Sequence, residues 1–201
     1  MKQDRSGRDF RRNGYAVLRR GISAEFAHVF ANYAILQALN PDYYIADVET
    51  RPLFPESRSR YADALGESLM LHVQPKIEKA VGESLLPTFS YLRIYEHGSV
   101  LGKHVDRRES EIAATLTLGA EASAPWPLRL QARDGVHALE LAPGDIAVYE
   151  GTKVPHWREI FQGRVWIQVI FNYVRANGEF AGAQFDGRPQ IGPIGRRRLA
   201  G

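Results

Sequence analysis

The strongest constraint on the fold is the segment from residue 88 to residue 174, in which apolar and polar residues alternate with a period of two. This alternation is typical of strands that bury one face, because successive side chains of a strand point to opposite sides of the sheet. The pattern predicts a series of short strands arranged as an antiparallel β-sandwich or jelly roll. Turn-forming residues separate the strands, at Gly119, Asp134-Gly135, Pro143-Gly144-Asp145 and Gln162-Gly163.

The N-terminal part of the chain, residues 15 to 82, has a helical period instead. Ser23 can cap a helix that carries Glu25 in its first turn. A second helix is predicted to end at Gly82 and to be kinked or split by Pro75. Apolar residues four apart predict the buried stripe of this helix, formed by Tyr61, Leu65, Leu69, Val73, Ile77 and Val81.

Together these patterns predict a protein of the α+β class, with a mostly β core and N-terminal helices packed on the outside. We expect a single domain over residues 1–185, with helical support in 15–82 and the jelly-roll core in 88–174, followed by a basic, flexible tail over 186–201. Residues 41–60 contain three prolines and many polar residues. A connection of this length is either a plain surface loop or a lid over a binding site.

The composition excludes several kinds of partner and site. The 26 basic and 23 acidic residues leave a formal charge of only +3, and three arginines cluster at 196–198, so the body of the domain is nearly neutral. This balance argues against nucleic acid as a partner. The sequence has no cysteine, so histidine and carboxylate are the strong metal ligands that remain. No apolar run reaches the roughly 20 residues of a membrane span, and the start lacks an apolar signal core, so we expect a cytoplasmic protein.

A candidate metal site follows the first long strand. The segment Tyr91–Glu96 leads through a glycine turn to His104 and Asp106, and His156 comes after a later turn and strand. Two imidazoles and one carboxylate can occupy one face of an octahedral metal and leave the other face open, the arrangement associated with non-haem iron(II) oxygenases. The pair His104-Val-Asp106 is a weak indication by itself, because a histidine beside an acid is often a surface pair. The order of the pieces along the chain strengthens the hypothesis.

The pieces that carry this order are Arg-Ile-Tyr-Glu-His-Gly before His104-Val-Asp106, then Ile-Ala-Ala-Thr-Leu-Thr-Leu-Gly, Leu-Ala-Pro-Gly-Asp-Ile-Ala-Val-Tyr, Pro-His156-Trp-Arg-Glu and Gln-Val-Ile-Phe-Asn-Tyr-Val. In this order they resemble the iron(II)/2-oxoglutarate-dependent dioxygenase superfamily, in its prolyl-hydroxylase-like branch. The resemblance implies a double-stranded β-helix that holds Fe(II) through His104, Asp106 and His156. It also implies 2-oxoglutarate as cosubstrate, dioxygen as oxidant, and hydroxylation of an unactivated C–H bond with release of succinate and CO2.

The distal carboxylate of 2-oxoglutarate needs a cation, best an arginine fork. In the superfamily this cation usually lies about ten residues past the second histidine, where this chain departs from the pattern with Trp166. Arg158 and Arg164 compete for the role. Arg164 is eight residues past His156, at the start of a strand, as the topology requires. Arg158 is two residues past His156 and in an extended strand points to the same face, about 6 to 7 Å deeper. We favour Arg158, because Trp166 facing inward would otherwise crowd the pocket.

Further site residues are expected on both sides of the metal motif. Tyr95 is the expected hydroxyl partner of the cosubstrate, and Arg93 shares its strand face two residues earlier. Substrate contacts are expected from Arg107 and Arg108 just past the motif, from Trp126 and from the proline-rich loop. Arginine and aromatic side chains suit an amino acid, a peptide or protein side chain, or an anionic natural product.

Three other functions stay open at this point. The first is a cupin-type metal barrel that uses iron without 2-oxoglutarate. The second is a non-catalytic binding module with a structural metal. The third is nucleic-acid dealkylation, which the same superfamily performs and which requires binding that weakens steeply with salt. The modest charge of the domain body argues against the third.

Overall fold

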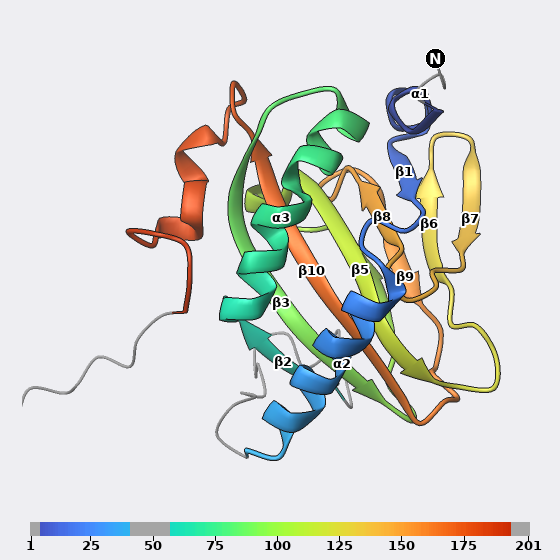
Figure 1. The fold of residues 1–201 in the computed structure, drawn as a ribbon. Helices are drawn as coiled ribbons and strands as arrows, with labels where there is room; N and C mark the ends of the chain where they lie inside the picture. The colour runs from blue at the N-terminus through green and yellow to red at the C-terminus, as the bar shows by residue number, and fades with distance from the viewer. Residues whose placement is uncertain (1–4, 41–56, 194–201) are drawn as a thin grey trace, which may run out of the picture.

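Two antiparallel β-sheets face each other in the computed structural model, which describes residues 5–40 and 57–193 (Figure 1). Within these residues the larger sheet has the strand order β1-β8-β5-β10-β3-β2, and the smaller sheet has the order β4-β9-β6-β7. The strands are β1 (Tyr15–Leu18), β2 (Ser57–Tyr61), β3 (Leu85–Glu96), β4 (Leu101–His104), β5 (Ile112–Glu121), β6 (Leu128–Ala132), β7 (Gly135–Leu139), β8 (Ile146–Tyr149), β9 (His156–Arg158) and β10 (Val165–Arg175). The helices are α1 (Arg5–Asn13), α2 (Ala24–Ala38) and α3 (Ala64–Val81), with 3-10 turns η1 (Arg108–Ser110) and η2 (Ala181–Gly187).

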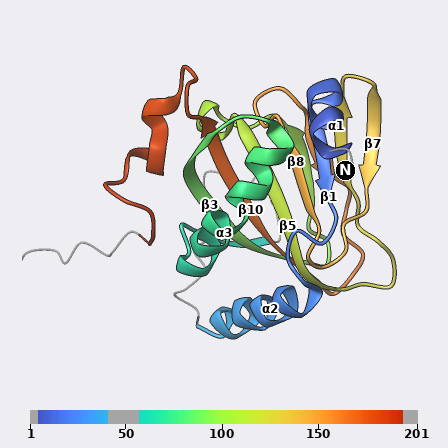
Figure 2. The ribbon, with the colours of Figure 1, turned by 45° about the horizontal axis from the view of Figure 1, so that its top comes forward.

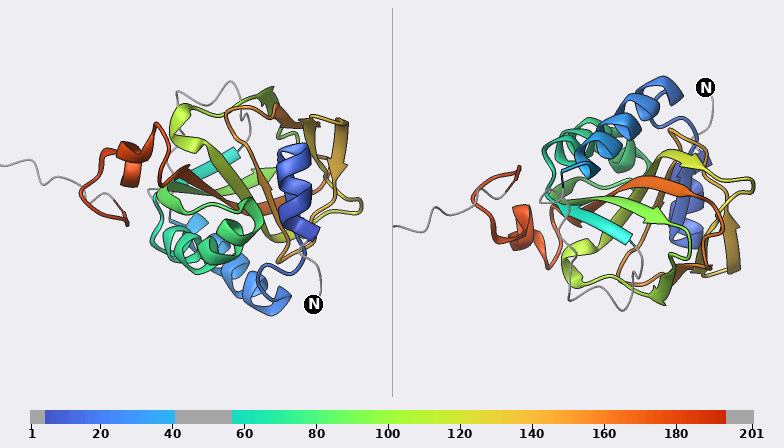
Figure 3. Two further views of the ribbon diagram at one scale, coloured as in Figure 1. Left: turned by 90° about the horizontal axis from the view of Figure 1, so that it is seen from above. Right: turned by 90° about the horizontal axis from the view of Figure 1, so that it is seen from below.

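The expected class is confirmed, because the core is mostly β and the helices lie outside it. The alternation of apolar and polar residues along the predicted strands corresponds to the two faces of the larger sheet. Leu92, Leu116 and Val169 are fully buried in the apolar core of its outer face. Figure 1 shows α2 and α3 in front of this face, and in the turned view of Figure 2 α3 stays in front of the strands while α2 lies below them. Figure 3 shows the β6–β7 hairpin, in yellow, at the end of the molecule opposite the C-terminal segment. The inner face, opposite the smaller sheet, packs partly against a second apolar cluster that includes Ala113, Ala147 and Leu130, and it also carries polar and aromatic side chains.

The helix α2 begins as predicted, with the Ser23 hydroxyl accepting a hydrogen bond from the backbone N–H of Phe26. Its buried positions are three alanines, and Phe26 itself is exposed. Small residues suit this face because the helix crosses close to the sheet: a Cβ added at Gly119 would lie 3.0 Å from that of Ala31.

The helix α3 buries most of the predicted stripe, from Leu69 to Val81, and ends at Gly82 in the left-handed conformation. The expected split at Pro75 is wrong, because the helix is continuous through it. Proline removes one backbone hydrogen bond, to the carbonyl four residues earlier, and here that residue is the exposed Leu71. Tyr61, expected on the same stripe, belongs to β2 instead.

The long connection before α3 is only partly described. Residues 57–60 belong to β2, an edge strand that pairs with β3 and that the polar run Ser-Arg-Ser-Arg did not reveal. Residues 41–56 lie outside the described part of the chain, so the choice between a plain surface loop and a lid stays open.

The division into a domain over 1–185 and a tail over 186–201 also stays a prediction. Arg188, beyond the expected boundary, has a buried side chain paired with Glu67 of α3 at 2.7 Å. The segment that carries it lies beside β3 (Figure 1). In the described residues, no helix has both the length and the apolar character to cross a membrane.

Candidate metal centre

Antiparallel pairing brings the two histidines of the motif together. His104 at the end of β4 and His156 at the start of β9 are direct register partners, and their ring centroids lie 4.3 Å apart. Asp106 joins them from the loop after β4, where its backbone N–H donates to the carbonyl of Gly151 at 2.8 Å. One ligand atom from each of the three side chains falls within 4.8 Å of the other two. The structure therefore gathers the three candidate ligands in one place.

The orientation of the imidazoles suits a metal ion. With the proton on Nδ1, His104 donates to the carbonyl of Gly102 at 2.7 Å and His156 donates to the carbonyl of Val154 at 3.1 Å. Each ring thereby directs Nε2 toward Oδ1 of Asp106, at 3.6 Å from His104 and 3.7 Å from His156. Ligand atoms about 2.1 Å from one ion at right angles lie roughly 3 Å apart, so the three side chains have to move closer together to coordinate a single ion. Backbone carbonyls that fix the ring tautomer are a usual feature of histidine metal sites.

The two imidazoles differ in their electrostatic environment. Burial alone would lower the pKa of His104, but its hydrogen bonds to Asp106 and to the carbonyl of Gly102, together with the charge of Asp106, raise it above the ordinary value. Burial is the largest effect on His156 and lowers its pKa. His156 is thus the readier of the two to offer a neutral nitrogen to a metal.

Gly151 lies against the candidate carboxylate ligand. A Cβ at this position would approach Oδ2 of Asp106 to 2.6 Å and would also overlap the carbonyl oxygen of Ser110. The Gly151 N–H donates to the carbonyl of Glu111 at 3.0 Å, which holds the turn in place. A residue without a side chain is therefore required beside Asp106. The sequence analysis missed this position.

The three ligand candidates border a cavity of about 260 Å³ between the two sheets. Its walls come from the inner faces of β3 and β10, from the loop after β4 and from the smaller sheet. They are predominantly apolar and aromatic, as expected for a small-molecule site with a few placed polar groups. Besides the three candidates, the lining residues are Phe89, Tyr91, Arg93, Tyr95, Leu101, Val105, Arg107, Ser110, Thr115, Leu128, Tyr149, Gln168, Ile170 and Asn172.

Two of the proposed cosubstrate residues reach this cavity. Arg93 and Tyr95 line it from the inner face of β3, as their shared strand face predicted, and both are buried. Next to them, the amide of Gln168 donates to the Tyr95 hydroxyl at 3.5 Å. Gln168 was missed by the sequence analysis, although it shares the inner face of β10 with Ile170 and Asn172.

The other two candidate arginines do not line the cavity. Arg158 is fully buried behind Gln168, to which it donates at 3.3 Å, and its guanidinium lies 4.6 Å from the ring centroid of Trp126 and 4.9 Å from that of Trp166. Burial lowers the pKa of Arg158 to about 10. Arg164 is exposed and paired with a carboxylate of β5.

The predicted substrate residues have different positions as well. Arg107 lines the mouth of the cavity, whereas Trp126 is buried away from it and donates through Nε1 to the carbonyl of Glu159. Arg108, next to Arg107, is exposed and pairs with Glu109 at 2.9 Å. Spacing along the chain could not predict which of these residues line the cavity, because it does not show which turns face the cavity.

Comparisons with known proteins are informative at the level of structure. No family model matches the chain, and no curated protein sequence matches it. A prolyl-4-hydroxylase of Pseudomonas putida superposes with a TM-score of 0.67 at 16% identity over 85% of this chain and 97% of that one. The epimerase SnoN of nogalamycin biosynthesis gives 0.72 at 12% identity over 95% and 91%. HygX of Streptomyces hygroscopicus, with nickel and 2-oxoglutarate bound, gives 0.66 at 12% identity over 86% and 87%.

These similarities extend over most of each chain, and at such low identity they show the fold. The resemblance inferred from the sequence, to the 2-oxoglutarate/Fe(II) oxygenases and to their prolyl-hydroxylase-like members, is thereby confirmed as a likeness of fold.

Proposed function

We propose that this protein is an Fe(II)- and 2-oxoglutarate-dependent oxygenase that hydroxylates an unactivated C–H bond of a small molecule or of an amino-acid or peptide side chain. The observation that carries the proposal is the convergence of His104, Asp106 and His156 at the border of the cavity. The fold comparisons support it, since a prolyl-4-hydroxylase and a protein that holds nickel and 2-oxoglutarate share this fold.

We also infer that the core is a double-stranded β-helix. From β3 to β10 the chain passes repeatedly from one sheet to the other, and β3, β5, β8 and β10 lie in the larger sheet while β4, β6, β7 and β9 lie in the smaller. Such a winding puts the ends of β4 and β9 next to each other, and these are the ends that carry His104 and His156.

The residues fit the group they would hold. Two imidazoles and one carboxylate are the donor set of non-haem iron sites with open positions, and the remaining side of the site faces the cavity. The bound iron supplies the oxidising chemistry, in which dioxygen gives one oxygen atom to the C–H bond and the other to succinate as CO2 leaves 2-oxoglutarate. The apolar walls exclude water from the reacting groups, and the chain contributes no separate acid or base to this scheme.

The position of the side chains changes our preference for the cosubstrate anchor. Arg93 lines the cavity, so its guanidinium can bind the distal carboxylate of 2-oxoglutarate, with the Tyr95 hydroxyl as a second donor. Arg158 acts on the cavity through Gln168. It donates to Oε1 of Gln168, and the amide nitrogen of Gln168 donates to the Tyr95 hydroxyl. We therefore propose Arg93 as the anchor and Arg158 as a positioning residue.

The test is an anaerobic titration with Fe(II) and then 2-oxoglutarate, following the weak visible charge-transfer band of the chelate. Wild-type protein should develop the band, and His104→Ala should not. Arg93→Gln should raise the 2-oxoglutarate concentration needed by about tenfold or more, because a charge-assisted hydrogen bond is worth about 1.5–3 kcal/mol. Arg164→Gln, which removes an exposed arginine outside the cavity, is the matched control and should behave as wild type.

Three results would count against the proposal. Iron binding without any response to 2-oxoglutarate would indicate a cupin-type enzyme. Saturation by both without succinate formation across a panel of substrates would indicate a binding module. An unchanged response in Arg93→Gln, with a weakened one in Arg158→Gln, would return the anchor to Arg158.

A further inference from the structure

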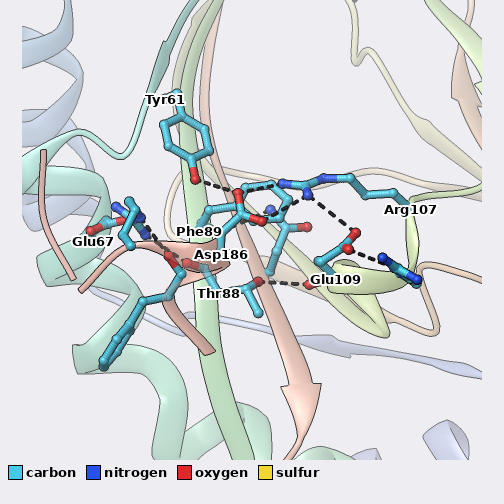
Figure 4. Close-up of polar contacts among 11 residues, drawn as sticks. Tyr61, Glu67, Thr88, Phe89, Arg107, Glu109 and Asp186 are labelled. Carbon is cyan, nitrogen blue, oxygen red and sulfur yellow. Dashed lines mark hydrogen bonds and ion pairs between the residues drawn. The ribbon is translucent and has the colours of Figure 1, made fainter. Parts of the chain in front are cut away.

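The mouth of the cavity contains an arginine whose charge is already compensated. Arg107 directly follows Asp106, and its Nη1 and Nη2 donate to the two carboxylate oxygens of Asp186 at 2.9 and 2.7 Å. Glu109 adds a second carboxylate at 3.3 Å, and the guanidinium lies over the ring of Phe89, 4.1 Å from its centroid (Figure 4). An arginine held by a bidentate carboxylate and an aromatic face has its best donors occupied.

Asp186 reaches Arg107 from a segment that is fastened to the body of the protein. The Arg188 guanidinium donates to Glu67 on α3 at 2.7 Å, and both side chains of this ion pair are almost fully buried. On the other side of Asp186, the Tyr61 hydroxyl donates to Oδ2 (Figure 4). The segment is therefore anchored independently of the Asp186–Arg107 pair.

The backbone supports a specific placement of this carboxylate. Phe185 and Asp186 have φ angles of 60° and 54°, in the left-handed region that residues with side chains rarely adopt. Two consecutive residues in this conformation persist only where surrounding contacts hold them. Here the contacts are those of Asp186 with Arg107 and Tyr61.

Arg93 and Arg107 are the two arginines among the described residues that line the cavity, and Arg107 already has a carboxylate partner. Much of the remaining lining is aromatic or aliphatic, as at Phe89, Tyr91, Val105 and Ile170. An anion that binds near Arg107 would lose its hydration against these walls and would have to displace Asp186 to reach that guanidinium. An uncharged molecule with a ring would gain apolar and aromatic contacts without that cost.

We propose that Asp186 is a specificity-determining residue: by occupying Arg107 it leaves an uncharged, aromatic mouth that admits uncharged, ring-bearing molecules and disfavours anionic ones. The inference rests on the proposed function for its view of this cavity as the substrate site. It departs from the expectation that Arg107 binds an anionic substrate directly.

The experiment compares two fluorescent probes that differ by one sulfonate, the uncharged N-phenyl-1-naphthylamine and the anionic 1-anilinonaphthalene-8-sulfonate. Both are titrated into metal-free protein with a chelator and without 2-oxoglutarate, so the result does not depend on the oxygenase assignment. Asp186→Asn should raise the affinity for the anionic probe by about tenfold and leave that for the uncharged probe unchanged. Adding Arg107→Gln to Asp186→Asn should remove the gain.

The controls isolate the Asp186–Arg107 pair. Glu121→Gln releases the exposed Arg164 away from the cavity and should change neither affinity. Tyr91→Ala alters the cavity wall and should weaken both probes, which places them in the cavity. Arg93 is present in all variants, so its contribution to the affinity for the anionic probe cancels when a variant is compared with wild type.

The proposal is overturned if Asp186→Asn gives no selective gain for the anionic probe, or if the gain survives Arg107→Gln. Circular dichroism and the unfolding midpoint show whether the variant keeps its fold. If Asp186→Asn does not fold, the double variant Arg107→Gln/Asp186→Asn decides the matter, because it removes both charges of the pair and leaves the net charge unchanged. It must leave the anionic probe's affinity within about twofold of wild type, because the proposal holds that Arg107 is already occupied.

Discussion

The two ends of the space between the sheets differ in how their polar groups are satisfied. At the metal end, the Nε2 atoms of His104 and His156 and the carboxylate of Asp106 point at one another, and His104 and Asp106 keep 16% and 19% of their side-chain surface exposed. At the other end, aromatic rings enclose Arg158, whose Nη atoms donate to the carbonyl of Trp126 and to Gln168, while its buried Nε has no hydrogen-bond partner among the described residues. These rings belong to Tyr95, Trp126, Phe161 and Trp166.

This difference separates binding from stability. At the metal end the three donor groups converge on one point that suits a metal ion, so changes there should alter metal binding more than folding. At the aromatic end the rings pack against one another, so removal of a ring there should alter folding more than metal binding. Four substitutions or conditions test the contrast, beginning with the largest effect.

Removal of the carboxylate ligand should abolish the metal site. In Asp106→Ala we expect the affinity for Mn(II) or Co(II) to fall by about 1,000-fold or more, because one of three protein ligands is lost from a site with binding energy on the order of 10 kcal/mol. Isothermal titration measures it. Asp134→Ala, which breaks the exposed pair with His137 at 2.7 Å, is the matched control and should bind metal normally. Retained metal binding in Asp106→Ala would refute the site.

Removal of a ring at the other end should cost stability. In Trp166→Ala we expect the free energy of unfolding to fall by about 3–5 kcal/mol, because a buried indole is replaced by a cavity. Urea denaturation measures this loss. The metal affinity should stay within about twofold of wild type, and a large loss of metal affinity would show that the two ends are coupled.

The glycine beside the carboxylate allows a finer test. In Gly151→Ala the new Cβ would collide with Asp106, so we expect metal affinity to fall by about 10- to 100-fold, as for other residues that position ligands. Gly182→Ala is the control, since a Cβ there has nothing within 4 Å. Equal affinities in the two variants would show that the Asp106 carboxylate adapts freely.

The pH dependence of metal binding should have two stages. His104 has a pKa above its ordinary value of 6.5, so once the pH falls below that raised pKa one proton competes with each metal ion, and the decline in affinity approaches about tenfold per pH unit. His156 has a pKa below 6.5, so its proton adds to the competition only at lower pH. Titrations with Co(II) between pH 8 and 5.5 measure the slope. A second proton that competes already at pH 7 would contradict this order.

Much of the architecture could be read from local patterns. Period-two alternation gives the strands and assigns Leu92 and Val169 to the covered face, because the side-chain direction of a strand follows from its pleat. The caps at Ser23 and Gly82 mark helix ends through local hydrogen bonding and backbone freedom. The strand β2 was not predicted, because an edge strand of Ser and Arg has no apolar face that a sequence pattern could reveal.

The arginines show what the sequence could not predict. Arg93, Arg107, Arg158 and Arg164 all stand near the motif in the chain, and spacing favoured Arg158 as the anchor. Only the packing reveals that Arg158 lies behind Gln168 and that Arg164 faces solvent.

By itself the sequence determined which residue types could bind a metal, the order in which they occur, and the alternation that makes them part of a β-sandwich. These properties are local, since they depend on side-chain chemistry and on the two-residue repeat of a strand. The tertiary structure decided that β4 pairs with β9 in the register that joins His104 to His156. It also decided that Asp186, in the C-terminal segment η2, forms an ion pair with Arg107. Both are contacts between distant segments, and their formation depends on the cooperative packing of the whole core.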